Sequence, residues 1–335
     1  MTSIKDISQA CGYSPSTVSK SLNYATDVGK ETAEKIRNVA EQMGYFPNSI
    51  ARALKTNRTF NIGVLFVDAT ASGLTHEFFS SILNSFKVEA DHQGYVITFI
   101  SNQINRNRVS LLEHCRHRNY DGVMIACVNF KNPEVVELVS SEIPTLSIDY
   151  EFPTCTSILS DNLGGMKKLT DYVIQKGHRK LAIIHGEGTE VTHIRLDSFF
   201  QTLNENRIQI PKYFIKPALY HEPLHSQIAT RELLCLPERP SCIFYPDDYS
   251  LLGGLDELEQ HHLRIPEDIS IVGYDGIFLS QILRPRITTM HQDTETIGKR
   301  AAEELINQIE NPRTYKRHRV VVKQDLLEGE TVKQL

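Results

Sequence analysis

From Phe60 onward, short runs of apolar residues alternate with longer stretches that repeat apolar residues at helical spacing. Runs such as Gly122 to Ala126 hold hardly any polar residue, so both faces of the strands that they form are expected to be buried. This alternation predicts parallel sheets covered by helices on both faces. The strands are too many for one sheet of ordinary size, so two α/β lobes are expected. The predicted strands are residues 62–67, 95–101, 122–126, 145–148, 181–184, 242–245 and 269–274.

The residues before this region predict a separate, all-helical module. Residues 4–10 carry apolar side chains at helical spacing, and Gly12 ends that segment. Ser14 can cap a second helix, and Pro15 suits its first position because the missing N–H costs nothing there. Two short helices joined by a glycine-containing turn form a helix-turn-helix unit, and a third helix is expected over residues 30–43.

The exposed face of the second helix carries small hydroxyl side chains and one cation, which suits a helix lying in the major groove of DNA. These residues are Pro15, Ser16, Thr17, Ser19 and Lys20. Residues 1–58 hold eight Lys or Arg against five Asp or Glu, whereas the whole chain has a net charge of −5. A basic module on an acidic body fits phosphate contact at one end only. A small three-helix module without a nucleic-acid role is the alternative.

Length and composition exclude several other classes of protein. The chain of 335 residues is too long for one typical domain, and no apolar run reaches the length of a membrane span. Its six cysteines show no paired spacing, so reduced thiols in a cytoplasm are expected. No dinucleotide fingerprint, Walker loop or nucleophile motif is present, so neither enzymatic activity nor a cofactor is predicted. His114 and His117 lack the further ligands that a metal site needs.

Two N-terminal strings resemble the headpiece of the LacI/GalR family of bacterial repressors. These are SPSTVSK at residues 14–20 and GYFPNSIARAL at residues 44–54. Four later strings, at residues 160–165, 177–180, 265–275 and 288–290, resemble the effector-binding core of the same family, and the similarity extends over essentially the whole chain. The resemblance implies a homodimeric, cytoplasmic regulator whose core looks like a type I periplasmic binding protein.

The family pattern also implies how the chain is divided. A headpiece would cover residues 1–46, a hinge helix residues 47–58, and the core residues 59–335. The N-lobe would hold about 59–160 and 292–322, and the C-lobe about 161–291 and 323–335. Three crossover strands are expected near Asp161, His291 and Lys323.

The resemblance further implies which residues contact a near-palindromic operator. A leucine matching Leu54 would insert into the minor groove and kink the duplex, although an ordinary linker whose leucine packs on the core is the alternative. The residues implied to contact DNA are Ser14, Pro15, Ser16, Thr17, Ser19, Lys20, Asn23, Asn48, Ala51, Arg52, Leu54 and Lys55.

A second set of residues is implied to bind a small-molecule effector. These are Phe78, Phe79, Asp149, Asp161, Arg195, Tyr220, Asp247 and Asp275. Guanidinium and carboxylate groups can bind diols, while aromatic faces cover the apolar side of a sugar ring. Gly276 stands where many members carry a second Asp, the pair Asp247-Asp248 replaces the usual Asn-Asp, and Thr189 stands where purine-responsive members carry an additional arginine.

An acidic cleft with few cations favours a neutral sugar as the effector. The resemblance implies a repressor that its effector releases from DNA. Two alternatives stay open. The ligand could act as a corepressor (a nucleobase, a sugar phosphate or a protein partner), or the chain could be a solute-binding protein without DNA activity.

Overall fold

The computed structural model describes residues 2–22, 27–45, 58–67, 73–104 and 107–335. The chain separates into two compact units, with the boundary after Phe60.

The N-terminal unit is a three-helix module. It contains α1 (Ile4–Cys11), α2 (Pro15–Leu22) and α3 (Lys30–Gln42). Ser3 caps α1 through a reciprocal pair of hydrogen bonds with Asp6, and Gly12 ends the helix in the left-handed region at φ 75°. The Ser14 hydroxyl accepts a hydrogen bond from the backbone N–H of Thr17 at 3.1 Å and so caps α2. The three helices enclose a small core of Ile7, Val18, Ile36 and Ala40.

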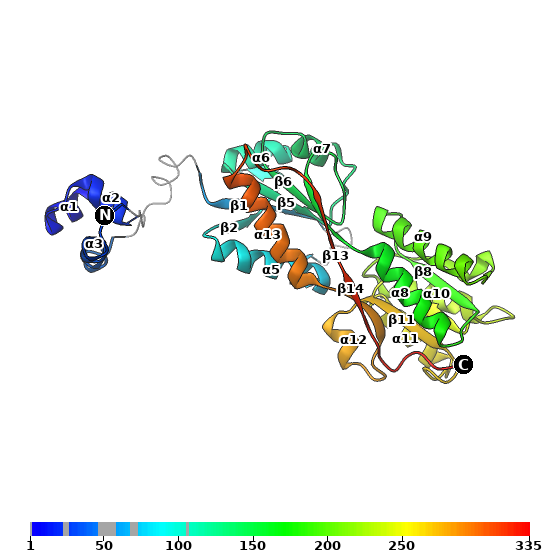
Figure 1. Cartoon of the computed structure of the whole chain (residues 1–335). Coiled ribbons are helices and arrows are strands. Elements are labelled where there is room, and N and C mark those ends of the chain that lie inside the picture. The colour runs from blue at the N-terminus through cyan, green and yellow to red at the C-terminus, as the bar shows by residue number, and fades with distance from the viewer. Residues whose placement is uncertain (1, 23–26, 46–57, 68–72, 105–106) are drawn as a thin grey trace. The chain divides into compact units, whose positions relative to one another are not determined.

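The second unit is built from two α/β lobes (Figure 1). In the N-lobe, six parallel strands follow the order β13-β7-β6-β5-β1-β2. The strands are β1 (Asn61–Phe66), β2 (Val96–Phe99), β5 (Gly122–Ala126), β6 (Thr145–Ile148), β7 (Thr156–Ser160) and β13 (Arg319–Val322). The helices are α5 (Glu77–His92), α6 (Leu111–Arg118), α7 (Pro133–Val139) and α13 (Thr294–Glu310). Short β3 (Gln103–Ile104) and β4 (Asn107–Arg108) form a separate ribbon, and η1 (Gly73–Thr75) precedes α5.

The C-lobe repeats this plan with one difference. Its strand order is β14-β12-β11-β10-β8-β9. Five of these strands are parallel, as predicted, and the additional edge strand β14 runs antiparallel to β12. The strands are β8 (Leu181–His185), β9 (Ile215–Pro217), β10 (Cys242–Phe244), β11 (Ser270–Asp275), β12 (Thr288–Gln292) and β14 (Gln324–Leu327). The helices are α8 (Asn162–Gln175), α9 (Glu190–Glu205), α10 (Pro223–Leu234), α11 (Leu251–Gln260) and α12 (Phe278–Ile282), and η2 (Lys212–Phe214) precedes β9.

The chain crosses between the lobes three times. It passes from β7 into α8 after Ser160, from β12 into α13 after Gln292, and from β13 into β14 at Lys323. The last crossing is visible as the red strands that run through both lobes in Figure 1. Because the C-terminal segment of this unit adds β13 to the N-lobe sheet and β14 to the C-lobe sheet, the two sheets are linked by three backbone segments.

Two further observations concern the residues that the structure describes. No helix among them combines the length and the apolar character needed to cross a membrane. They contain no group of three metal-binding side chains, and His114 lies buried within α6.

Candidate functional site

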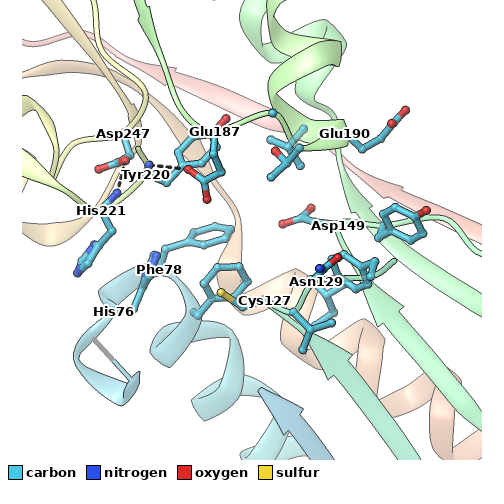
Figure 2. Close-up of a pocket in the computed structure, with 18 of the residues that line it drawn as sticks. His76, Phe78, Cys127, Asn129, Asp149, Glu187, Glu190, Tyr220, His221 and Asp247 are labelled. Atoms are coloured by element: carbon cyan, nitrogen blue, oxygen red, sulfur yellow. Dashed lines mark hydrogen bonds between the residues drawn. The ribbon is translucent and has the colours of Figure 1, made fainter. Parts of the chain in front are cut away.

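A cavity of about 420 Å³ lies between the two lobes, where loops leave the carboxyl ends of the strands (Figure 2). Parallel strands direct their carboxyl ends to one edge of a sheet, and ligands of α/β proteins bind there. Seven of the eight residues implied by the sequence to bind an effector line this cavity. They are Phe78, Phe79, Asp149, Arg195, Tyr220, Asp247 and Asp275.

Asp161 is the exception. It is the N-cap of α8, and its carboxylate accepts a hydrogen bond from the backbone N–H of Gly164 at 2.9 Å. It is absent from the cavity lining. The expected cleft position is therefore a helix cap, because a carboxylate between a strand and a helix can serve either purpose.

Arg195 is held rigidly at the base of the cavity. Its guanidinium carbon lies 3.6 Å from the centre of the Tyr274 ring, a close cation–π contact. Its Nε donates a hydrogen bond to Asn162 Oδ1 at 2.8 Å, and its Nη1 donates to the carbonyl of Pro246 at 3.2 Å. Its Nη2 lies 3.9 Å from Asp275 Oδ1. Arg195 and Asp275 thus present a donor and an acceptor side by side.

Two carboxyl groups flank this arginine. Asp275 accepts a hydrogen bond from Gln292 Nε2 at 2.7 Å, and burial raises its pKa to about 7 against the opposing effect of Arg195. Asp149 accepts from the backbone N–H of Ser160 at 3.2 Å, and burial raises its pKa as well. Both residues have positive φ, 96° for Asp275 and 58° for Asp149. A polar ligand can therefore meet an acceptor, a donor and a second acceptor in one place.

Asp247 has a different environment. Its two oxygens accept hydrogen bonds from the backbone N–H and the hydroxyl of Ser250, at 2.6 and 2.8 Å, and from the backbone N–H of His221 at 2.8 Å. Because both oxygens are engaged, Asp247 chiefly fixes the loop that carries His221. Figure 2 shows this contact at one end of the cavity.

Aromatic side chains cover the apolar sides of the cavity. Phe78 and Phe79 meet edge to face with ring centres 5.0 Å apart. Tyr220 comes from the opposite lobe, and its hydroxyl lies 2.9 Å from that of Thr192. A Cβ at Gly186 would overlap the Tyr220 ring, so glycine is needed there for the ring to pack against the backbone.

Several lining residues were missed by reasoning from the sequence. His76 of the N-lobe stacks on His221 of the C-lobe with ring centres 4.1 Å apart, and His221 stacks on Tyr249 at 3.9 Å. Close by, Glu77 Oε1 accepts a hydrogen bond from the backbone N–H of Phe278, also across the lobes, at 2.7 Å. No motif signals such contacts, because they depend on how the lobes meet. Other residues first seen to line the cavity in the structure include Cys127, Asn129, Glu187 and Glu190 (Figure 2). Gln292 lines it as well.

In the helical module, the predicted DNA-contacting face of α2 is partly engaged within the protein. The hydroxyls of Ser14 and Thr17 lie 2.9 Å apart, Pro15 and Ser16 are exposed, and Ser19 is partly exposed. Lys20 pairs with Asp27, and this hydrogen bond lowers the pKa of the Asp27 carboxyl. The remaining positions lie outside the described residues. They are Asn23, Asn48, Ala51, Arg52, Leu54 and Lys55.

The sequence matches known protein families at both ends. Residues 3–48 match the model of the bacterial regulatory proteins of the lacI family, and residues 170–332 match a periplasmic binding protein-like domain. The HTH-type transcriptional repressor PurR of Haemophilus influenzae (strain PittEE) is 31% identical over 314 residues, which are 92% of this chain and 91% of that protein. The chain belongs to the LacI family of bacterial regulatory proteins.

Solved structures of LacI-type regulators share the fold of this LacI-family chain. The lac repressor dimer bound to operator and the anti-inducer ONPF matches with a TM-score of 0.81 and 22% identity, covering 99% of each chain. The transcriptional regulator CelR in complex with cellobiose matches with a TM-score of 0.72 and 21% identity, covering 99% of this chain and 100% of that one.

These matches confirm the predicted family and the predicted fold, a helix-turn-helix headpiece with a two-lobed core. The chain is a DNA-binding transcriptional regulator with an effector-binding domain. The family consists of regulators and not of enzymes, in agreement with the sequence.

Proposed function

We propose that this LacI-family protein is a homodimeric repressor that binds a near-palindromic operator and is released by a small neutral sugar. The observation that supports a sugar as the ligand is that Asp149, Arg195 and Asp275 line the cavity together, beside aromatic rings. Vicinal hydroxyls both donate and accept hydrogen bonds, so they can satisfy this set of acceptor, donor and acceptor. The Phe79 and Tyr220 rings can cover the apolar face of a pyranose.

The charge of the cavity favours a neutral ligand over an anion. Its acidic lining residues are Asp149, Glu187, Glu190, Asp247 and Asp275, and its Lys and Arg residues are Lys131 and Arg195. Arg195 already faces Asp275, so little positive charge is left to compensate a phosphate or a carboxylate. An anionic ligand would have to enter a cavity of like charge and low dielectric, which is unfavourable.

A thermal-shift screen of the full chain tests this proposal. The compounds are cellobiose, D-ribose, D-galactose, D-galacturonate, glucose 6-phosphate, guanine and hypoxanthine. A ligand at about one hundred times its Kd adds roughly 2.7 kcal/mol to the free energy of unfolding, which raises Tm by several degrees. The expected result is a rise with a neutral sugar that is lost in Asp275→Asn and kept in Asp161→Asn. The control makes the same substitution at a helix cap outside the cavity, where Asn caps equally well.

Other outcomes of the screen count against the proposal. A response only to the phosphate, the uronate or a nucleobase would overturn the neutral sugar. A sugar response that survives Asp275→Asn would place the ligand elsewhere. If none of the three neutral sugars raises Tm, none of them is the effector. The screen would then move to other neutral mono- and disaccharides.

For DNA, we infer that α2 lies in the major groove. Ser16 and Lys20 would contact base edges, while Pro15 would offer an apolar contact to a thymine methyl. Ser14, Thr17 and Ser19 would contact phosphates or neighbouring bases, with Asn23, Asn48, Ala51, Arg52 and Lys55 as further contacts and Leu54 as the minor-groove wedge.

Exposed apolar side chains support the homodimer. Val88 on α5 and Val96 and Phe99 on the edge strand β2 are exposed in the N-lobe. In the C-lobe, Phe278 on α12 is 70% exposed, and Leu224, Ile228 and Ile282 are also exposed. Large apolar side chains that are exposed in one chain can be covered at a protein–protein contact, and two-fold symmetry in the protein matches two-fold symmetry in an operator.

A further inference from the structure

A row of buried hydrogen bonds leads away from the cavity floor. Asp275 Oδ1 accepts a hydrogen bond from Gln292 Nε2 at 2.7 Å. Gln292 Oε1 in turn accepts from Gln324 Nε2 at 3.3 Å, and Gln324 Nε2 also donates to Ser160 Oγ at 2.9 Å. Gln292, Gln324 and Ser160 are all buried. These three side chains are called the crossover cluster below.

Each member of the crossover cluster lies on a different connection between the lobes. Ser160 is the last residue of β7, Gln292 is the last residue of β12, and Gln324 is the first residue of β14. The chain passes from one lobe to the other directly beside each of them. The side chain of Gln324 therefore joins its own crossover to the other two.

Gln324 is also linked to the arginine of the cavity. The Tyr274 hydroxyl donates a hydrogen bond to Gln324 Oε1, and the Arg195 guanidinium lies on the Tyr274 ring at 3.6 Å. Asp275 reaches Gln324 through Gln292, and Arg195 reaches it through Tyr274. A Cβ at Gly165 would overlap both the Gln324 amide and the Tyr274 hydroxyl, so glycine leaves the space that this arrangement needs.

We propose that Gln324 is a positioning residue that couples the ligand-facing pair Asp275 and Arg195 to all three crossovers between the lobes. Its amide oxygen accepts one hydrogen bond and its amide nitrogen donates two, so it cannot move without breaking a buried contact. A buried polar group without a hydrogen-bond partner is unfavourable. If Asp275 moves, Gln292 and Gln324 therefore have to move with it, and the three crossovers shift as a result. Only the identity of the ligand in this inference rests on the proposed function.

Hydrogen–deuterium exchange of the full chain without ligand tests the coupling. In Gln324→Leu, peptides covering residues 158–163, 289–294 and 320–326 are expected to exchange about tenfold faster, because the three hydrogen bonds of the Gln324 amide are lost. The matched control is Gln308→Leu on α13, where the amide oxygen has no hydrogen-bond partner. Exchange in Gln324→Leu no faster than in the control would overturn the proposal.

A double-mutant cycle separates coupling from a merely structural role. Asp275→Ala is expected to accelerate exchange at residues 158–163 and 320–326 in the wild-type background, and to add little in the Gln324→Leu background. Fully additive effects would overturn the proposal. No ligand is needed, so a failed sugar screen and a failed coupling test are distinguishable.

Gly165→Ala is a second variant that tests the same coupling if Gln324→Leu does not fold. It keeps every polar group of the crossover cluster and forces the Gln324 amide from its place. It is expected to give the same pattern of faster exchange at the three crossovers. If both variants fold and both leave the crossovers at wild-type exchange rates, Gln324 does not couple them.

Discussion

His76 and His221 stack across the cleft, one imidazole from each lobe, with ring centres 4.1 Å apart and planes inclined by 13°. This stack lines the cavity between the lobes, and the hydrogen bond from the Phe278 N–H to Glu77 lies beside it. The lobes are therefore joined both by the crossovers and by side-chain contacts between them.

Replacing His76 by Ala is expected to weaken binding of the effector roughly three- to tenfold, because an aromatic pair contributes about 0.5–1.5 kcal/mol beyond its buried area. The change should appear in the dissociation rate, measured by stopped-flow or surface plasmon resonance with the sugar found in the screen. His117→Ala, at an exposed position on α6, is the control. Equal affinities in both variants would show that the stack does not hold the closed lobes.

Arg195→Lys is expected to lower effector affinity at least tenfold. Lysine keeps the positive charge but loses the planar group that lies on Tyr274 and binds Asn162 and Pro246 at once. Isothermal titration calorimetry measures the loss, and Arg319→Lys, at an exposed position on β13, is the matched control. An affinity within twofold of wild type would mean that charge alone suffices.

The stability of the ligand-free protein is expected to depend on the protonation of Asp275. Its pKa is raised to about 7 by burial, so between about pH 4 and pH 7 the native state binds more protons than the unfolded state. The contribution of this group to stability is thus fully present near pH 4 and is lost as pH rises through 7. Asp275→Asn removes this dependence and is expected to unfold at higher denaturant concentration than wild type at pH 8. Urea titrations at pH 5 and pH 8 measure the free energy of unfolding. Asp161→Asn should keep the pH dependence of the wild type.

Lys20→Ala is expected to reduce discrimination between operator and mismatched DNA by about 1–3 kcal/mol, since a charged side chain on a base edge is lost. The exposed pair with Asp27 contributes little stability, so Tm should be nearly unchanged. Fluorescence anisotropy with a selected operator and a scrambled duplex gives both affinities. The control is Lys5→Ala on α1, which should lower the affinities for the operator and for the scrambled duplex by the same small factor. If Lys20→Ala leaves the ratio intact, α2 is not the reading helix.

The dimer is expected to involve the exposed edge of the N-lobe sheet. Val96→Asp places a charge on the exposed edge strand β2 and should raise the dimer dissociation constant at least tenfold in sedimentation velocity. Val136→Asp on α7 makes the same change at a comparably exposed position elsewhere. Dimers of equal strength in both variants would exclude this edge from the interface.

Elements with a local signal could be predicted from the sequence. Strand β5 and helix α3 follow from the local pattern of apolar residues, and Ser14 and Gly12 mark helix ends by their own chemistry. Arg195 and Asp275 could be located because they match positions of a known family. The structure brings both into one cavity.

Features that depend on distant contacts could not be predicted. Asp161 follows a strand as a ligand-binding residue would, yet its carboxylate caps the next helix. The stack of His76 on His221 joins residues of different lobes. Gln324 forms a hydrogen bond with Ser160, which lies 164 residues before it in the sequence. The antiparallel direction of β14 follows from the third crossover, whose local sequence gives no sign of it.

The third crossover also has a consequence for how the protein is made. Strands β13 and β14 follow every other strand of the two lobes in the sequence, yet one is an edge strand of the N-lobe sheet and the other an edge strand of the C-lobe sheet. Until residues 319–327 have been translated, both sheets lack an edge strand, and α13, which precedes these residues, has itself only just been made. Neither lobe can therefore finish folding as an independent nascent domain, and the two are expected to mature together late in translation.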